Sequence, residues 1–286
     1  MRFEFPHGKR FAFTVFDDTD LATVANVKPV YDHLLRCGLR TTKSVWTLAP
    51  TQPPRIDGAT LADPAYRDFV LGLKEAGVEI ASHGATSHSA TRAQTQEALE
   101  RFRDLIGHYP KIHCNHSMNR DNIYWGAARL TTRRYRWFYR LATLTKDRRY
   151  EGHVEDSPYF WGDLCRRHIR YVRNFVFREI NLLNVHAGIP YHDPAKPYVN
   201  EWFTSTQAAD VDAFCEAVAP AAQQRLDDEG GVAILYTHFG SGFVENGKLD
   251  DRFCRLMDRM ARRDGWFVPA GTLLDWLRER REAAAI

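Results

Sequence analysis

Short apolar runs alternate with amphipathic stretches along most of the chain. The run FAFTVF at 11–16 predicts a buried strand, and apolar residues then recur at helical spacing through 24–34. Further strands are predicted near 44–48, 78–81, 111–113, 230–239 and 266–269. Helices are predicted over about 63–76, from 89 or 91 to 106, over 250–262 and at the C-terminal end. This alternation is typical of a parallel sheet or barrel with helices outside it.

The middle of the chain departs from this alternation. The stretch 145–200 is rich in aromatic residues and contains four prolines. It is too aromatic for a linker, so we interpret about 127–205 as an insertion or cap over the site. The whole chain, 1–286, is then a single barrel domain, because about 250 residues in one domain is common for α/β barrels.

Composition places the chain among ordinary globular proteins. Hydrophobic residues make up 44% of it and charged residues 26%, which excludes disorder, collagen and coiled coil. The five cysteines form no CxxC pair, which argues against a disulfide framework or a zinc ribbon. The first residues lack the apolar core of a signal peptide, and no run approaches the roughly 18 apolar residues of a membrane span. We therefore expect a cytoplasmic protein with no transmembrane segment.

The net charge of +3 is too small to indicate nucleic-acid binding by the protein as a whole. The segment 129–150 nevertheless holds eight basic residues and one acidic residue, a net charge of +7. Four of its arginines, Arg129, Arg133, Arg136 and Arg140, fall on one side of a helical wheel, which predicts an amphipathic basic helix. Such a helix is either a solvated face or a surface that recognises anions. The anion would be an acidic or lipid-linked sugar, or an anionic membrane to which the protein binds peripherally.

Polar residues follow three of the predicted strands. Asp17 and Asp18 end the first strand, His83 and His88 follow the strand at 78–81, and His238 ends the run ILYTHF. The carboxyl ends of parallel strands converge on one rim, where α/β folds build their sites. One carboxylate with two imidazoles is a common ligand set for a catalytic divalent metal, and the second carboxylate would be free to act as a base. The alternative for the two acids is a helix cap.

Four segments together resemble the NodB-type polysaccharide deacetylase family. They are FTVFDD (13–18), EIASHGATSH (79–88), ILYTHF (234–239) and WFVPAGTLLDWL (266–277). The resemblance implies a distorted (β/α) barrel and a hydrolase that removes the N-acetyl group of an amino sugar in a glycan or glycan precursor. It also implies one divalent metal, zinc above all, with cobalt, nickel or manganese as alternatives.

The same resemblance implies roles for individual residues. Asp17 would be the base, His238 the acid, and Asp18 and His83 metal ligands. Four residues lie between His83 and His88 in the second motif, where the family has three between its histidines, so His116 stands beside His88 as an alternative third ligand. The family's third motif carries an arginine that supports the base, whereas this chain reads PKIHCNHS at 110–117.

Four further residues are candidates for substrate binding. Asn115 and Arg120 would bind sugar hydroxyls, and Tyr159 and Trp161 would pack against sugar rings, unless the aromatic pair fills a small core. Two other functions remain open. One is hydrolysis of a small cyclic amide or imide, with or without a metal. The other is glycan binding by a catalytically inactive barrel.

Overall fold

The computed structural model describes residues 4–116, 118–130, 132 and 150–284. Within them, parallel strands close into a ring in which each strand pairs with the next and the last pairs with the first. The ring consists of β1 (Phe11–Asp17), β2 (Thr42–Val45), β3 (Glu79–Ser82), β4 (Ile112–His113), β5 (Tyr171–Phe177), β6 (Glu201–Gln207) and β7 (Val232–Thr237). A further strand, β10 (Gly265–Phe267), pairs with β1 in parallel outside the ring. The predicted barrel is therefore confirmed.

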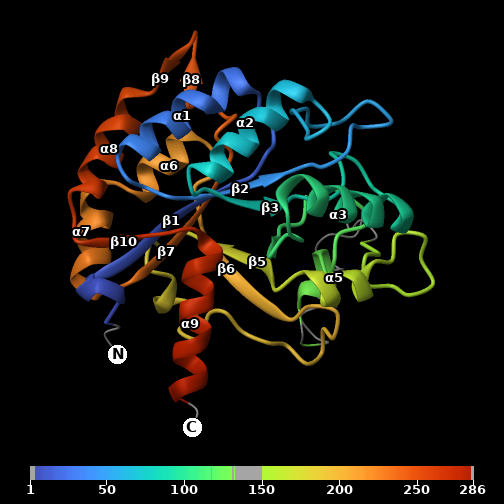
Figure 1. The fold of residues 1–286 in the computed structure, drawn as a ribbon. Helices are drawn as coiled ribbons and strands as arrows, with labels where there is room; N and C mark the ends of the chain where they lie inside the picture. The colour runs from blue at the N-terminus through green and yellow to red at the C-terminus, as the bar shows by residue number, and fades with distance from the viewer. Residues whose placement is uncertain (1–3, 117, 131, 133–149, 285–286) are drawn as a thin grey trace.

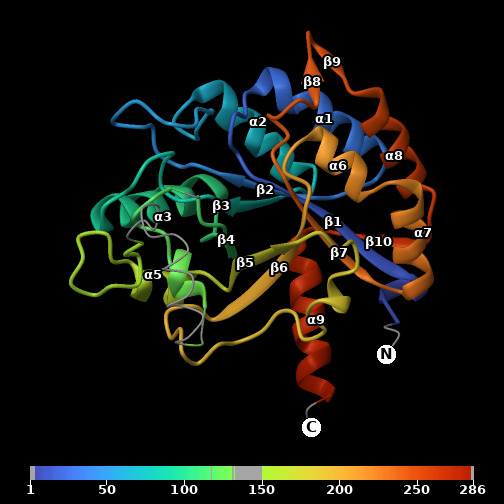
Figure 2. The same ribbon diagram turned by 180° about the vertical axis from the view of Figure 1, so that it is seen from behind.

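Helices surround the ring (Figure 1). They are α1 (Val24–Arg36), α2 (Pro64–Glu75), α3 (Arg92–Ile106), α5 (Gly162–His168), α6 (Val211–Ala217), α7 (Pro220–Glu229), α8 (Asp251–Ala261) and α9 (Ala270–Ala284). Helices α1, α2, α6 and α8 gather on one side and α3 and α5 on the other, as both views show (Figures 1 and 2). A small hairpin of β8 (Val244–Glu245) and β9 (Lys248–Leu249) precedes α8. Helices α1 and α3 begin where the side chains of Thr23 and Thr91 accept hydrogen bonds from free N–H groups of the first turn.

Alternation along each strand separates two hydrophobic cores. In β1, Phe11, Phe13 and Val15 belong to the core under the outer helices, whereas Ala12 and Phe16 belong to the core inside the barrel. Successive side chains of a strand point to opposite faces, so every second position faces the interior. The interior core also contains Ala81 of β3, Ile112 of β4, Tyr171 of β5 and Ile234 of β7.

The range 127–205, which the sequence suggested as an insertion, contains two strands of the barrel. Strand β5 pairs with β4, and β6 links β5 to β7, so these segments close the ring. Aromatic and polar residues in YVRNFVF and EWFTSTQ hide the simple apolar pattern that marks the other strands. Most of the basic stretch 129–149, for which a helix was predicted, lies outside the described residues. Among the described residues, no helix is long and apolar enough to span a membrane.

Candidate functional site

A pocket of about 320 Å³ opens at the carboxyl ends of the barrel strands. It is lined by acidic, imidazole, guanidinium and aromatic side chains: Asp18, Asp20, His83, Asn115, His116, Trp125, Arg129, Arg173, Phe175, Val176, Gln207, Tyr236 and His238. Several of them lie two positions beyond an interior core residue: Asp18 after Phe16, His83 after Ala81, Arg173 after Tyr171, and Tyr236 after Ile234. The alternation that fills the barrel with apolar side chains therefore also directs these polar groups into its mouth.

Three side chains of this pocket converge. His83 Nε2 lies 2.9 Å from Asp20 Oδ2, and His116 Nδ1 lies 3.3 Å from both Asp20 Oδ1 and His83 Nε2. All three residues are buried. Trp46, which is fully buried, packs against both imidazoles, with ring centroids 5.7 Å from His83 and 5.2 Å from His116.

The donor set fits a divalent metal. Tetrahedral bonds of about 2.0 to 2.1 Å place nitrogen and oxygen ligands roughly 3.3 Å from one another, close to the spacing found here. Among the described residues, Asp20 Oδ2 is buried and has no well-aligned hydrogen bond, although His83 Nε2 lies 2.9 Å from it. Buried polar atoms without a partner are costly, and a cation held by this carboxylate and these imidazoles would compensate that cost.

The predicted ligand set of Asp18, His83 and His88 is not what the structure brings together. The carboxylate next to His83 Nε2 is Asp20, and the second imidazole is His116, the residue that the sequence offered as an alternative. Asp18 lies on the other side of His83, with its Oδ2 3.9 Å from Nδ1. Asp18, Asp20 and His238 also form a looser group of possible ligands.

Arg173 of β5 holds Asp18. Its Nη1 donates to Asp18 Oδ1 at 3.0 Å, and its Nη2 donates to Oδ2. Burial raises the pKa of Asp18, but Arg173 and His83 outweigh burial, so that pKa is lowered overall. A bidentate pair fixes the carboxylate's orientation as well as its charge. Arg173 therefore fixes Asp18 in the pocket, although it comes from a distant part of the chain.

His238 lies at the edge of the same pocket. Its Nδ1 faces the carbonyl oxygen of Ala209 at 2.8 Å, so this nitrogen carries a proton and donates it. Its Nε2 faces the pocket, 3.1 Å from the hydroxyl of Tyr236 and 3.7 Å from Asp20 Oδ2. The structure thus places His238 in the same pocket as Asp18, Asp20 and His83.

Asp17, the predicted base, points away from the pocket. Its side chain is on the same face of β1 as those of Phe13 and Val15, toward the outer helices, and it is fully buried under α1 and α2. Its Oδ2 accepts from Lys43 Nζ at 2.7 Å and from Tyr31 at 2.9 Å, while its Oδ1 accepts from the Phe239 N–H at 2.8 Å. With both oxygens occupied, Asp17 cannot reach a substrate. The carboxylate that faces the pocket is Asp18, because side chains alternate along the strand.

We expect Asp17→Asn to destabilise the fold. Burial disfavours the charge of Lys43, but the Asp17 carboxylate raises the pKa of Lys43 overall and keeps it protonated. Removing one partner of a buried ion pair costs about 3 to 5 kcal/mol of unfolding free energy. Urea unfolding measures the loss, and Asp17→Asn with Lys43→Met should recover part of it. If Asp17→Asn instead has wild-type stability and binds metal but does not hydrolyse substrate, Asp17 is the base.

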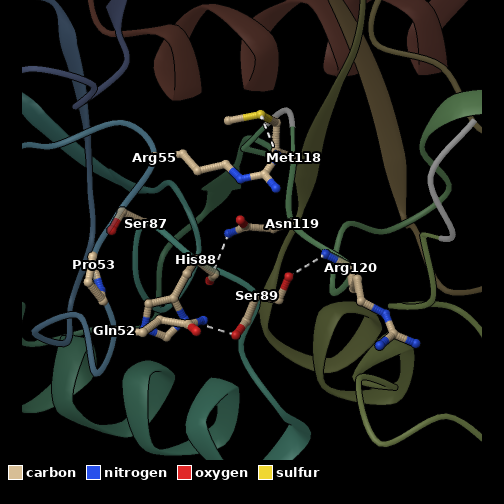
Figure 3. Close-up of a pocket in the computed structure, with 9 residues that line it drawn as sticks. All are labelled: Gln52, Pro53, Arg55, Ser87, His88, Ser89, Met118, Asn119 and Arg120. Atoms are coloured by element: carbon tan, nitrogen blue, oxygen red, sulfur yellow. Dashed lines mark hydrogen bonds between the residues drawn. The ribbon is translucent and has the colours of Figure 1, made fainter. Parts of the chain in front are cut away.

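His88 belongs to a different cavity, of about 470 Å³ (Figure 3). Its Nε2 accepts from the Thr51 N–H at 2.9 Å, and its Nδ1 lies 3.0 Å from the carbonyl oxygen of Ser89. Nε2 thus joins the loop after β3 to the loop after β2, while Nδ1 contacts the carbonyl oxygen of the neighbouring residue in the same loop. His88 therefore has a structural position, and its spacing from His83 does not reflect a shared ligand set.

The predicted substrate-binding residues divide between the two cavities and the core. Asn115 lines the site, but its amide bonds both backbone groups of Ile123 and so shapes the loop. Arg120 lines the His88 cavity, pairs with Glu151 at 3.0 Å and stacks on Tyr159 at 4.4 Å.

Trp161 is only 2% exposed, and its Nε1 donates to the carbonyl oxygen of Asp121 at 2.6 Å. It packs edge-on against His113, with ring centroids 4.9 Å apart. Trp161 therefore belongs to a small hydrophobic core, which was the alternative interpretation of the sequence. The aromatic residues that do line the pocket are Trp125, Phe175 and Tyr236.

Asp121, behind the site, gives a second stability prediction. Its Oδ1 accepts from the Ala90 N–H at 3.0 Å, and burial raises the pKa of Asp121 from 3.8 to about 7. Between these values the unfolded chain releases a proton that the folded chain keeps, so the free energy of unfolding falls as pH rises. Asp121→Asn retains the acceptor oxygen and has no charge to bury. Above pH 7 its free energy of unfolding should therefore exceed that of the wild type by up to about 4 kcal/mol. Denaturant titrations at pH 5 and pH 8 test this, because the gain should be much smaller at pH 5.

Sequence reasoning missed Asp20 as a ligand and Arg173 as the partner of Asp18. Asp20 follows the pair in the same polar run, DDTD, where the sequence offers either Thr19 or Asp20 as the cap of the next helix. Thr23 provides that cap, which leaves Asp20 free for the pocket. No local signal marks Arg173, because only the closing of the ring brings β5 opposite β1.

Comparison with known proteins supports the fold. No protein-family model and no curated protein matches the chain. Two solved bacterial structures resemble it over nearly their full lengths, and both carry a provisional assignment as polysaccharide deacetylases. The structure from Pseudomonas aeruginosa has a TM-score of 0.57 at 13% identity, covering 98% of this chain and 95% of that one.

The structure from Mycobacterium smegmatis has a TM-score of 0.54 at 12% identity, covering 98% and 94% of the two chains. At such low identity the likeness concerns the fold. The chain therefore has the barrel fold of the polysaccharide deacetylases, as the sequence motifs imply.

Proposed function

We propose that this protein is a metal-dependent hydrolase that removes the N-acetyl group of an amino sugar. The observation that carries the proposal is the buried cluster of Asp20, His83 and His116, next to the Asp18–Arg173 pair and His238 in one pocket. Two carboxylates and three imidazoles at the mouth of a barrel provide the ligands, base and acid that amide hydrolysis requires.

Asp20, His83 and His116 would hold the metal, zinc being the ion that best fits one oxygen and two nitrogen ligands. When bound, such an ion lowers the pKa of a coordinated water and polarises the acyl oxygen. Trp46 packs against the two imidazoles and fixes their orientation from behind. Positioned ligands of this kind hold one geometry through the reaction.

Asp18 accepts the proton of the attacking water. Arg173 keeps this carboxylate ionised and prevents it from rotating, so that it stays directed at the pocket. His238 Nε2 then protonates the leaving amine, while the Ala209 carbonyl holds the opposite ring nitrogen. Asp20 Oδ2 lies 3.7 Å from His238 Nε2.

The outer wall of the pocket indicates the substrate. Trp125 and Phe175 offer apolar ring surface for a pyranose, and the guanidinium carbon of Arg129 lies 3.7 Å from the ring centroid of Trp125 and 5.0 Å from that of Phe175. A cavity of 320 Å³ accommodates one sugar unit rather than a long stretch of polymer. The guanidinium of Arg129 lies at the mouth of the pocket, and guanidinium groups bind phosphate. We therefore favour a phosphorylated or lipid-linked glycan precursor over a neutral chain.

Acetate release tests the function. The protein is stripped with a chelator, reloaded with zinc, and offered neutral N-acetylglucosamine oligomers, a nucleotide-linked N-acetyl sugar and a small cyclic imide. Zinc-dependent acetate release that is faster for the nucleotide-linked sugar is expected. Turnover of the imide alone, or equal activity after chelation, would contradict the proposal. Sugar binding by calorimetry with no acetate released would identify an inactive glycan-binding barrel.

A further inference from the structure

A second group of metal-ligating atoms lies outside the pocket, where α1 meets α8. His33 and Cys37 are four residues apart at the C-terminal end of α1, on one face of the helix. Asp258 reaches them from α8, which runs beside α1 (Figure 1). His33 is buried, and Cys37 and Asp258 are half-buried.

The three ligand atoms form a nearly equilateral triangle. His33 Nε2 lies 3.2 Å from Asp258 Oδ1, Cys37 Sγ lies 3.3 Å from the same oxygen, and Sγ lies 3.6 Å from Nε2. Zinc bonds to sulfur at about 2.3 Å and to nitrogen and oxygen at about 2.0 Å. Tetrahedral angles then separate sulfur from nitrogen or oxygen by about 3.5 Å, and nitrogen from oxygen by about 3.3 Å. The observed triangle matches one face of that tetrahedron.

A catalytic relay does not explain this arrangement. In a nucleophile–histidine–acid relay the thiol and the carboxylate contact opposite ring nitrogens. Here both Cys37 and Asp258 face Nε2 of His33. Burial and the Asp258 carboxylate also raise the pKa of the Cys37 thiol to about 11, the opposite of what a nucleophile needs.

We propose that His33, Cys37 and Asp258 bind a second divalent cation of the zinc class, with water at the fourth position. The thiol proton passes to solvent as the Sγ–metal bond forms. The ion joins the end of α1 to α8, two helices that otherwise meet here through hydrogen bonds. This site is independent of the pocket and of the proposed hydrolysis.

One contact must change when the ion binds. Arg36 Nη2 lies 3.4 Å from His33 Nδ1, which accepts from it while Nε2 bears the proton. A metal on Nε2 moves that proton to Nδ1, so the guanidinium has to turn away. Arg36 is exposed, so its side chain can move into water at little cost.

Cobalt(II) provides the test, because a thiolate bound to it absorbs in the near ultraviolet and nitrogen or oxygen ligands do not. The full-length protein is stripped with a chelator under reducing conditions and titrated with cobalt. We expect this charge-transfer band in the wild type, and its loss in Cys37→Ser and in Asp258→Asn. Zinc added afterwards should displace cobalt and abolish the band.

Two controls separate this site from the pocket. Cys215→Ser changes another half-buried cysteine and should keep the band. His116→Ala removes a pocket ligand and should also keep it, whatever happens to acetate release. The proposal is overturned if the wild type shows no band under saturating cobalt, or if the band persists in folded Cys37→Ser or Asp258→Asn protein.

Discussion

Replacing Asp18 with asparagine should lower kcat by about 10²- to 10⁴-fold, the range typical of losing a general base. The substitution keeps the shape of the side chain but removes the oxygen that accepts the proton from water. Because Asp20, His83 and His116 are untouched, the variant should still bind one equivalent of metal in the pocket. Steady-state acetate release and metal analysis of the same preparation measure the two effects.

Asp18→Asn also leaves Arg173 without its buried counter-charge, so the fold must be checked separately. Urea unfolding shows whether the inactive variant is native. Arg173→Lys is the matched variant, because lysine keeps the positive charge but cannot hold both carboxylate oxygens at once. It should lose less activity than Asp18→Asn. Native, metal-loaded Asp18→Asn protein with wild-type turnover would remove Asp18 from the mechanism.

His116→Ala should abolish metal binding in the pocket and reduce turnover to the level of the chelator-treated enzyme. Loss of one of three protein ligands is expected to weaken metal affinity by more than about 100-fold, since even the residues behind ligands contribute up to that amount. His88→Ala should leave metal affinity unchanged, because both nitrogens of His88 contact the loops around it. Zinc titration with a competing chromophoric chelator measures both affinities.

The paired histidine variants decide between the two ligand sets that the sequence left open. Asp20→Asn should behave as His116→Ala does, since it removes the only carboxylate that touches both imidazoles within the part of the chain described. If His88→Ala lost the metal and His116→Ala retained it, the loop after β3 would have to rearrange on metal binding. The cluster of buried imidazoles would then not be the metal site.

The sequence predicted the elements that have simple patterns. Strand β1 was recognisable from FAFTVF and β7 from VAILYT, because apolar runs bounded by polar residues are typical of buried parallel strands. Helices α1 and α3 were equally clear from their apolar stripes, and α3 also from its cap at Thr91. Strands β5 and β6 were missed, because each carries charged or polar residues that face the site and interrupt the pattern.

By itself, the sequence determined that the chain alternates strands and helices and that acids and histidines follow β1, β3 and β7. It also contained, in order, the motifs whose resemblance to the polysaccharide deacetylases implies the barrel. These patterns can be recognised in the sequence because each is local to a short stretch of chain. The orientation of Asp18 also follows from the sequence. Asp18 lies two positions after Phe16, so its side chain points to the same face of the strand, toward the barrel interior.

Only the tertiary structure decided which of these groups meet. Arg173 lies 155 residues from Asp18 along the chain, and His116 lies 33 residues from His83. Their contacts depend on how the ring closes and on where each loop leaves its strand. Spacing along the chain could not distinguish His116 from His88. The loop after β3 turns so that His88 lies in a different cavity, whereas His116, which follows β4, lies in the pocket at the strand ends. Distances between strands, rather than intervals in sequence, therefore select the residues of the site.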